Sequence, residues 1–273
     1  SYRIDSIGDP SFKKDWNLRF PVIGGSMANG ISSVELVAAL ANSGMTGFYG
    51  AAGQSLQVVE EAILRLKKLC GDNPWGVNLI HTPQEPAMEE QVVDLLLRHH
   101  VTSIEASAYM TMTRALVRYR VHGIRRDENG RIVTPNRILA KASRVEVATK
   151  FFSPPPESIM KSLVDDGTLT SEQAELCKNI PIASDVTAEA DSGGHTDNRP
   201  LVTLLPSFLS LRRQLQEKFK YDTPLRIGAG GGISTPGSTA AAFAMGAGWV
   251  LLGSIAQASV ESGSSTTVRE MLA

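Results

Sequence analysis

The sequence predicts an α/β fold, and more narrowly a closed (β/α)₈ TIM barrel. Short apolar or β-branched runs alternate with amphipathic helical stretches along the whole chain, which is typical of βα units around a parallel sheet. Eight such units can be counted, and glycine or polar residues follow most of the apolar runs. A length of 273 residues is one that an α/β barrel fills as a single domain. We therefore expect residues 1–273 to form one barrel.

The strands and helices are assigned from the period of the apolar residues. The first three strands are expected at Phe20–Gly25, Thr46–Gly50 and Trp75–Ile80, followed by helices at Ser33–Asn42, Leu56–Leu69 and Glu89–His99. The other five strands are expected at Ser103–Ala106, Arg137–Lys141, Ile182–Glu189, Leu225–Ala229 and Trp249–Gly253. An open doubly wound sheet shares this alternation, but it usually has fewer units and a glycine motif after its first strand. The late glycine loop of this chain favours the barrel.

One insertion interrupts the repeat between the fifth and sixth strands, at about residues 153–180. Three consecutive prolines, Pro154–Pro156, cannot continue a helix, and two short helical stretches follow them at Glu157–Asp165 and Ser171–Lys178. We expect a small helical unit near the rim of the barrel, or a surface elaboration without function. The chain stops inside the eighth helical pattern, so we also expect a C-terminal portion beyond Ala273.

Composition excludes several classes of protein. The 27 Lys and Arg against 28 Asp and Glu leave no basic field for nucleic acid, which we do not expect as a partner. No segment approaches the ~20 apolar residues of a membrane span, and the N-terminus has no apolar signal core, so we expect a cytoplasmic protein that does not enter a membrane. Cys70 and Cys177 lack CxxC spacing, and the five histidines show no ligand pattern, so no metal is predicted.

Glycines follow both of the last two strands. Gly230, Gly231 and Gly232 lie between the seventh strand and a helix that begins near Pro236, and Gly253 and Ser254 follow the eighth strand. Barrels often bind phosphate with these two loops, because exposed N–H groups and a helix N-terminus attract an anion. A tight turn without a ligand is the alternative for the glycine string. The pair of loops favours a phosphate site.

A phosphate at that corner would extend a phosphorylated cofactor across the mouth of the barrel, and flavin mononucleotide (FMN) fits this arrangement. Gly25, Ser26 and Met27 would let backbone amides approach the flavin ring, and Asn78 would hydrogen-bond its carbonyl or N–H groups. The alternatives are an ordinary turn for the glycines and a strand-end cap for Asn78. Lys141 ends an apolar strand, so it is a cofactor contact, a Schiff-base nucleophile or a rim salt bridge.

The run from Glu189 to Pro200 is the densest group of polar residues in the chain. It holds two glycines, Gly193 and Gly194, and then His195, the side chain best suited to proton transfer near neutral pH. A structural hydrogen bond is the alternative role for His195, and His81 is a secondary candidate. Glu189 and Asp191 are interpreted as structural more often than catalytic. The run therefore predicts one edge of a site, with His195 as its catalytic residue.

From Phe20 to about Glu270 the chain resembles the FMN-dependent barrel family of nitronate monooxygenases and flavin-type enoyl reductases. The run Asp-Ser-Gly-Gly-His-Thr-Asp-Asn-Arg-Pro, at positions 191–200, resembles the PfaD branch, the trans-acting enoyl reductases of polyketide and polyunsaturated fatty acid synthases. The stretch 247–265 is similar to the segment after the flavin phosphate in that branch. The family more often has threonine where Ser254 stands, and the hydroxyl is kept either way.

The resemblance implies a cofactor, a reaction and partners. FMN is implied to contact Gly25, Ser26, Met27, Asn78, Lys141, Gly193, Gly194, Gly231, Gly232, Gly253 and Ser254, with His195 as the functional histidine. NADPH would be the hydride donor, and the substrate would be an enoyl thioester on acyl carrier protein. Exposed rim helices are compatible with a homodimer.

Two other functions compete with the enoyl reductase. A nitronate monooxygenase would share the cofactor and the histidine but would need oxygen, so NADPH consumption with an enoyl thioester separates the two reactions. A non-catalytic docking protein that keeps a flavin or phosphate site within a synthase belongs to a different class. Purified protein without yellow colour and without stabilisation by added FMN would favour that third interpretation.

Overall fold

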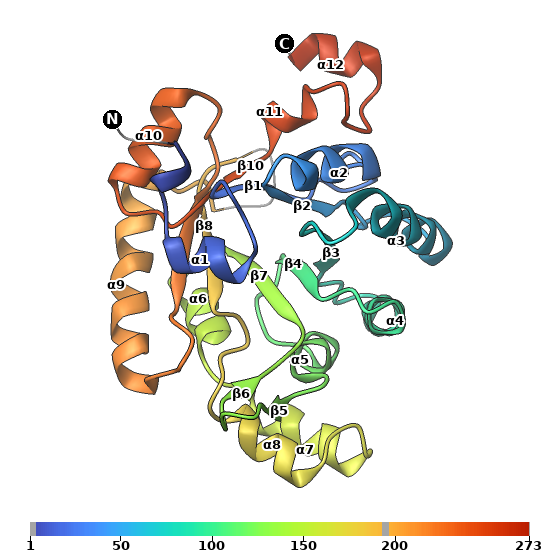
Figure 1. Ribbon diagram of the computed structural model, residues 1–273, viewed down its shortest axis with the longest axis vertical. Coiled ribbons are helices and arrows are strands. Elements are labelled where there is room, and N and C mark those ends of the chain that lie inside the picture. The colour runs from blue at the N-terminus through green and yellow to red at the C-terminus, as the bar shows by residue number, and fades with distance from the viewer. Residues whose placement is uncertain (1–3, 193–196, 273) are drawn as a thin grey trace.

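Eight parallel strands close into a barrel in the computed structural model, which describes residues 4–192 and 197–272 (Figure 1). Around the barrel the strands follow the order β1, β10, β9, β8, β7, β4, β3, β2, so neighbours in the chain are neighbours in the barrel. The predicted closed eight-stranded barrel is confirmed. The strands are β1 (Val22–Gly24), β2 (Thr46–Tyr49), β3 (Gly76–Ile80), β4 (Ser103–Ser107), β7 (Arg137–Ala142), β8 (Asp185–Glu189), β9 (Arg226–Gly230) and β10 (Val250–Leu252).

Helices surround the barrel, and several begin at a side chain that caps the first turn. Ser33, Ser55 and Thr113 each accept a hydrogen bond from a backbone N–H three residues later, and Thr170 and Thr235 form complete capping boxes. The helices are α1 (Pro10–Asp15), α2 (Val34–Asn42), α3 (Leu56–Cys70), α4 (Pro86–Arg98), α5 (Arg114–Val121), α6 (Val145–Phe152), α7 (Glu157–Asp165), α8 (Ser171–Cys177), α9 (Leu201–Phe219), α10 (Pro236–Ala244), α11 (Ser254–Gln257) and α12 (Thr266–Leu272). A short 3₁₀ turn, Ile4–Ser6, precedes them.

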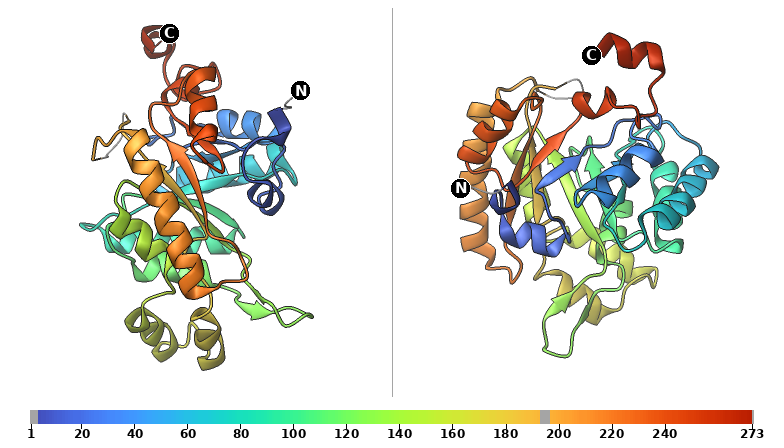
Figure 2. Two further views of the ribbon diagram at one scale, coloured as in Figure 1. Left: turned by 90° about the vertical axis from the view of Figure 1, so that its left-hand side faces the viewer. Right: turned by 45° about the horizontal axis from the view of Figure 1, so that its top comes forward.

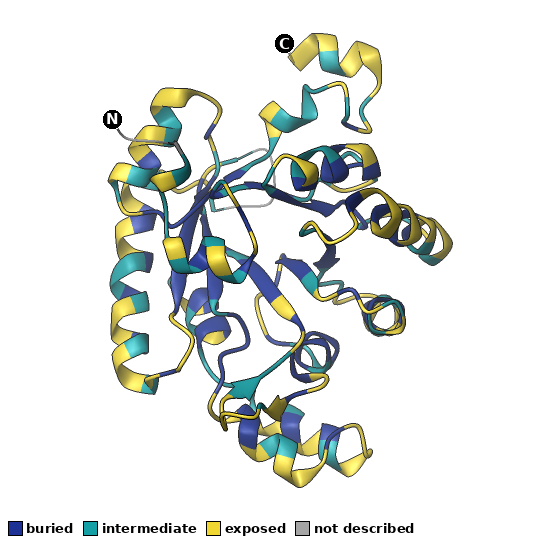
Figure 3. Ribbon diagram, in the orientation of Figure 1, coloured by how far each residue is buried: buried dark blue, intermediate teal, exposed yellow. Residues whose placement is uncertain are grey.

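Two apolar cores hold the molecule together. The larger core lies between the outward faces of the strands and the helices around them, and it includes the buried thiols of both cysteines. The smaller core fills the barrel itself and is closed by α1, whose Phe12 stacks on Trp249 with ring centroids 4.0 Å apart. Figure 3 shows the consequence, buried strands inside helices whose outer faces are exposed. Within residues 4–192 and 197–272, no helix is long and apolar enough to cross a membrane.

The boundaries differ from the sequence prediction at two elements. Strand β8 begins at Asp185 and not at Ile182, because the N–H groups of Ile182 and Ala183 donate to carbonyls at the end of α6 and not to a neighbouring strand. A two-stranded hairpin, β5 (Arg125–Arg126) and β6 (Ile132–Val133), precedes β7 and was not predicted. Its turn is held by the Asp127 carboxylate, which accepts from two backbone N–H groups.

The proline-interrupted insertion forms α7 and α8, as the sequence predicts. The two helices lie on the outer flank of the barrel beside α5 and do not cover its mouth (Figure 2). Gln173 in α8 donates to the carbonyl of Ile124, which follows α5, and Arg114 at the start of α5 pairs with Asp166. The expectation of a unit near the rim is therefore replaced by a unit on the flank.

A buried ion pair closes the amino end of the barrel. The Arg226 guanidinium donates to both oxygens of Asp185 at 2.6 and 3.1 Å, and the Trp16 indole N–H donates to the same carboxylate at 2.8 Å. Arg226 also donates to Asp15 at 2.6 Å, so α1 is fastened to β8 and β9. The side chains of Arg226 and Asp185 are only 3% and 5% exposed, so the Asp185 carboxylate depends on Arg226 for its charge compensation.

We expect the substitution Arg226→Met to lower the free energy of unfolding by about 3–5 kcal/mol, because it leaves the Asp185 carboxylate buried without its partner. Urea denaturation of the purified protein measures this change. The matched control is Lys161→Met, which breaks an ion pair with Asp165 whose side chains are 75% and 60% exposed. The control should lose less than about 1 kcal/mol, and equal losses in the two variants would contradict the assignment.

Candidate functional site

Polar side chains form the inward-facing layer at the carboxyl end of the barrel. Asn78 pairs in register with Glu105, and Glu105 with Leu139, which belongs to the core inside the barrel. Neighbours in register share one face of a sheet, and every second residue along a strand returns to that face. Asn78, Glu105 and Lys141 therefore point inward, with Glu189 beside them on β8. Strands β3, β4 and β7 and the end of β8 thus place an amide, two carboxylates and an ammonium group at the mouth of the barrel.

The Glu105 carboxylate is the hub of this layer and is fully buried. Its Oε2 accepts a hydrogen bond from the Ser26 amide at 2.8 Å and a second, short one from the Ser26 hydroxyl. The same oxygen lies 3.6 Å from the ammonium of Lys141. Its other oxygen, Oε1, is buried and accepts no hydrogen bond from the part of the chain that the structure describes.

Lys141 lies between two carboxylates. Its Nζ is 3.6 Å from an oxygen of Glu105 and 3.6 Å from an oxygen of Glu189. Burial disfavours the charged amine, but the charges of Glu105 and Glu189 outweigh burial and raise the pKa of Lys141 above its ordinary value. The ammonium is therefore kept protonated at neutral pH. A Schiff-base nucleophile needs a neutral amine, so this arrangement favours an electrostatic role.

Asn78 is 5% exposed and is fixed by two hydrogen bonds. Its Nδ2 donates to the carbonyl of Glu105 at 3.1 Å and to the hydroxyl of Ser107 at 2.9 Å. Both bonds use the amide nitrogen, so they set the orientation of the side chain without using its carbonyl oxygen. The structure thus places Asn78 in the same polar layer as Lys141, as the sequence predicts.

The loop after β1 is held close to the end of β10. The amide of Gly25 donates to the carbonyl of Leu252 at 2.9 Å, and a Cβ at position 25 would approach the side chain of Leu251 to 2.4 Å. Ser32 accepts from the amide of Met27 and donates to the carbonyl of Gly25, each at 2.9 Å. A side chain at this position would have to displace Leu251, and the loop places Ser26 against Glu105.

The glycine corner after β9 and β10 includes two residues in the left-handed backbone region. Gly231 has a φ of +93°, and a Cβ there would come within 2.8 Å of the carbonyl oxygens of Ala190 and Asp191. Gly230 ends β9, Gly232 follows with a φ of +69°, and Thr235 then caps α10. Across the corner, Gly253 precedes Ser254 at the start of α11, and a Cβ on Gly253 would meet no described atom within 4 Å.

Three predicted residues of the run after β8, Gly193, Gly194 and His195, lie outside the described residues. The described residues on either side of them are held by hydrogen bonds. The amide of Asp191 donates to the carbonyl of Arg199 at 2.9 Å. Asp197 accepts two hydrogen bonds from Arg144, both at 2.8 Å, and one from the hydroxyl of Ser143 at 2.9 Å. The run is thus joined to the loop that follows Lys141.

Glu105 is the site residue that the sequence analysis missed, and Glu189 was interpreted as structural. The signal for Glu105 was present: it is a carboxylate at the centre of the run Ser-Ile-Glu-Ala-Ser, where a strand of a packed barrel ordinarily holds apolar residues. The secondary candidate His81 is not in this layer. Its ring stacks on Tyr109 with centroids 5.1 Å apart, and Tyr109 in turn donates to the buried carboxylate of Glu89.

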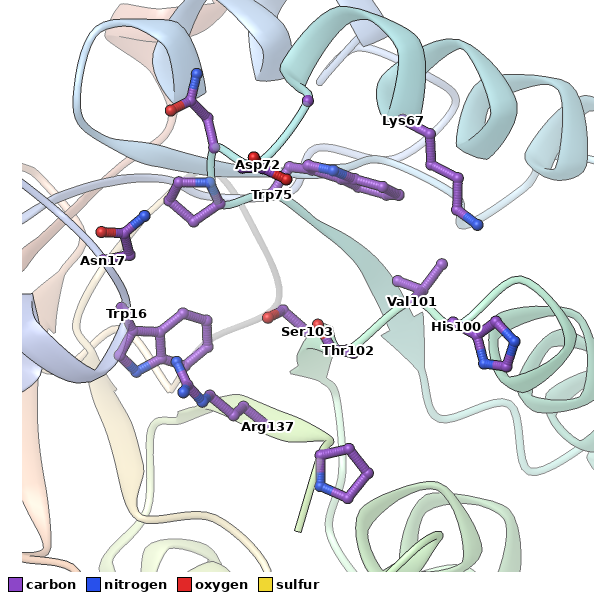
Figure 4. Close-up of a pocket in the computed structure, with 14 residues that line it drawn as sticks. Trp16, Asn17, Lys67, Asp72, Trp75, His100, Val101, Thr102, Ser103 and Arg137 are labelled. Carbon is purple, nitrogen blue, oxygen red and sulfur yellow. The ribbon is translucent and has the colours of Figure 1, made fainter. Parts of the chain in front are cut away.

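A cavity of about 370 Å³ lies at the other end of the barrel (Figure 4). It is lined by residues before or at the start of β3, β4 and β7, among them Trp75 and Arg137, by Trp16 after α1, and by none of the predicted site residues. The carboxyl ends of barrel strands are where such folds carry their chemistry, so we place the candidate site at the mouth. Among residues 4–192 and 197–272, no group of three or more His, Cys, Asp or Glu is arranged to hold a metal ion.

The fold and the mouth together define an α/β barrel with a buried ammonium between carboxylates and a glycine corner suited to an anion. Residues 11–273 match the nitronate monooxygenase family, and the chain belongs to that family. The family resemblance that the sequence predicts is thereby confirmed.

Relatives and solved structures narrow the comparison. The chain is 43% identical over 269 residues to the polyketide biosynthesis protein PksE of Bacillus subtilis (strain 168), covering 98% of this chain and 35% of that protein. It is 41% identical over 271 residues to a component of the polyunsaturated fatty acid synthase of Thraustochytrium sp., covering 98% of this chain and 18% of that component. The chain thus spans about a third or less of these two relatives' length.

Among solved structures, the enoyl reductase domain of MlnA from the macrolactin biosynthesis cluster of Bacillus amyloliquefaciens superposes with a TM-score of 0.95. That domain is 42% identical, and the match covers 98% of this chain and 61% of the other. FabK from Thermotoga maritima superposes with a TM-score of 0.65 at 21% identity, over 99% and 67% of the two chains. The second likeness concerns the fold alone.

We expect Gly231→Ala to lower the free energy of unfolding by about 1–3 kcal/mol, because alanine disfavours a positive φ and its Cβ would press on two carbonyl oxygens. Thermal and urea denaturation measure the loss. The matched control is Gly237→Ala in the first turn of α10, where the nearest atom to a Cβ is 3.9 Å away. The control should be neutral or stabilising by up to about 1 kcal/mol, and a neutral Gly231→Ala would disprove the strained corner.

The bonds to Asp197 predict a specific dependence on pH. Hydrogen bonds from Arg144 and Ser143 lower the pKa of Asp197 from 3.8 to about 2, so their contribution to stability is present at neutral pH and is lost as the pH falls through about 2. A carbon-13 NMR titration of the Asp197 carboxyl should show this low midpoint. In Arg144→Ala the midpoint should rise toward 3.8. An unchanged midpoint would show that Arg144 does not hold the carboxylate in solution.

Proposed function

We propose that this barrel is an FMN-dependent, NADPH-using enoyl reductase. Its substrate would be the α,β double bond of an enoyl thioester carried by acyl carrier protein in polyketide or polyunsaturated fatty acid synthesis. The observation that carries the proposal is the similarity to the enoyl reductase domain of MlnA, at a TM-score of 0.95 and 42% identity. The relatives from polyketide and polyunsaturated fatty acid synthesis support the same setting.

The residues at the mouth fit FMN. The glycine corner at Gly230–Gly232 and Gly253, with the hydroxyl of Ser254, suits the phosphate, and the positive φ of Gly231 and Gly232 is compatible with amides that face an anion. Gly25, Ser26, Met27 and Asn78 would contact the ring. Fully buried in the same layer, the unused Oε1 of Glu105 offers an acceptor to a group that the chain does not supply from its described residues.

When bound, FMN supplies hydride transfer, first from NADPH and then to the β-carbon of the enoyl thioester. The protein's part is to support the negative charge that develops and to deliver a proton. The ammonium of Lys141, kept charged by Glu105 and Glu189, provides a fixed positive charge at the mouth. His195 would polarise the thioester carbonyl or donate the proton to the α-carbon, directly or through water.

A nitronate monooxygenase is the second candidate, because the family that residues 11–273 match carries that activity in its description. That reaction would use His195 as a base and would consume oxygen. Anaerobic assays separate the two: NADPH oxidation that depends on an enoyl thioester supports the reductase. The reductase proposal is refuted if the yellow protein takes up oxygen with a nitronate and does not oxidise NADPH when an enoyl thioester is added.

The substitution His195→Ala should lower thioester-dependent NADPH oxidation by about 10²- to 10⁴-fold, because the proton donor is removed. Steady-state kinetics with a purified, flavin-loaded protein measure the effect. The matched control is His81→Ala, since the ring of His81 stacks on Tyr109 and belongs to none of the contacts of the polar layer described above. Its rate should fall by less than about tenfold, because no proton transfer is assigned to it. Equal effects of the two substitutions would remove His195 from its catalytic role.

A further inference from the structure

We propose that Glu105 is a cofactor-binding residue, whose Oε1 accepts a hydrogen bond from an N–H or O–H group of bound FMN. The inference rests on the proposed function and assigns a role to a side chain that neither the sequence motifs nor the relatives single out. It rests on a difference between the two oxygens of the buried Glu105 carboxylate, of which one has hydrogen-bond partners and the other accepts no hydrogen bond from the described residues.

The two oxygens of that carboxylate differ in their hydrogen bonds. Oε2 is fully used, because it accepts from the amide and the hydroxyl of Ser26 and lies 3.6 Å from the ammonium of Lys141. Oε1 is buried and accepts nothing from residues 4–192 and 197–272. A carboxylate has about four acceptor positions, and buried polar atoms in folded proteins almost always have a partner. The unused oxygen therefore requires a donor.

Glu105 also lies among residues that the sequence analysis expects to contact the cofactor. Its carboxylate contacts Ser26 in the loop after β1 and Lys141 near the end of β7. Asn78, the ring contact expected on β3, donates to the backbone carbonyl of Glu105. Glu105 thus contacts three of the positions expected to bind the cofactor.

A carboxylate selects the type of ligand group that it meets. It accepts hydrogen bonds and donates none, so Oε1 is suited to an N–H or O–H and repels a carbonyl or phosphate oxygen. FMN carries an N–H on its ring and hydroxyls on its ribityl chain. Leu139 on β7 is the register partner of Glu105, and Lys141 lies two residues further along the same strand. The positive charge of Lys141 complements the oxygens of the same ligand.

The substitution Glu105→Gln isolates Oε1. The amide oxygen of glutamine can replace Oε2 and keep the two bonds from Ser26, while the NH₂ group replaces an acceptor with a donor at the position of Oε1. We expect the dissociation constant for FMN to rise by about tenfold or more, as for the loss of a hydrogen bond to a charged group. Quenching of flavin fluorescence without NADPH or thioester measures it. The apo forms of variant and wild type should have the same circular dichroism and melting temperature.

The comparison variant is Glu189→Gln, which removes the other carboxylate beside Lys141 and leaves Oε1 of Glu105 in place. It should weaken FMN binding clearly less than Glu105→Gln does, because it removes a charge near Lys141 but not the acceptor Oε1. An equal loss in both variants would assign the effect to the charge beside Lys141, and wild-type affinity in Glu105→Gln would assign the partner of Oε1 to another part of the chain or to water. Either result overturns the proposal.

A second variant protects the test against misfolding. Glu105→Asp keeps the charge and withdraws the acceptor by one methylene, so it should also weaken FMN by about tenfold or more. Wild-type affinity in a folded Glu105→Asp would overturn the role of Oε1. Failure of the wild-type protein to bind FMN would refute the proposed function itself. Binding by the wild type with equal binding by the Glu105 variants would refute only the role of Glu105.

Discussion

The ammonium of Lys141, shared between the carboxylates of Glu105 and Glu189, is the interaction on which the mouth of the barrel depends. It joins β7 to the strands on either side of it, β4 and β8. Through Oε2 of Glu105 it also holds the loop after β1, because the amide and hydroxyl of Ser26 bind the same oxygen. One largely buried cation thus links side chains of three strands and, through Glu105, one loop.

The rest of the barrel makes that arrangement both stable and effective. Below the polar layer, the aromatic core of Phe12, Phe48 and Trp249 excludes water, so charges above it interact more strongly than they would in solvent. Burial of charge is unfavourable unless each group has a partner. At the amino end, Arg226 and Asp185 also provide each other with a partner, and this ion pair has a structural role only. The two ends of one barrel therefore use buried charge for different purposes.

The sequence was sufficient for the fold because each strand carries its own apolar run, and for the glycine corner because positive φ and close backbone approach leave few alternatives to glycine. It was insufficient for Glu105, since recognising that side chain requires the register that aligns Asn78, Glu105 and Leu139. The hairpin of β5 and β6 was missed because strands of two residues, one of them Arg-Arg, have no apolar period. The start of β8 shifted because Ile182 and Ala183 bond to the end of α6.

Membership of a family whose barrels serve more than one reaction means that the fold alone does not select the chemistry. Selection must come from groups that meet the substrate, and the proposed catalytic residue belongs to the loop after β8. Its described ends are anchored by the backbone bond between Asp191 and Arg199 and by the hydrogen bonds from Arg144 and Ser143 to Asp197. Because Ser143 and Arg144 directly follow β7, any movement of this loop is coupled to the strand that carries Lys141. The strand that carries Lys141 and the described ends of the loop after β8 are therefore joined by direct hydrogen bonds.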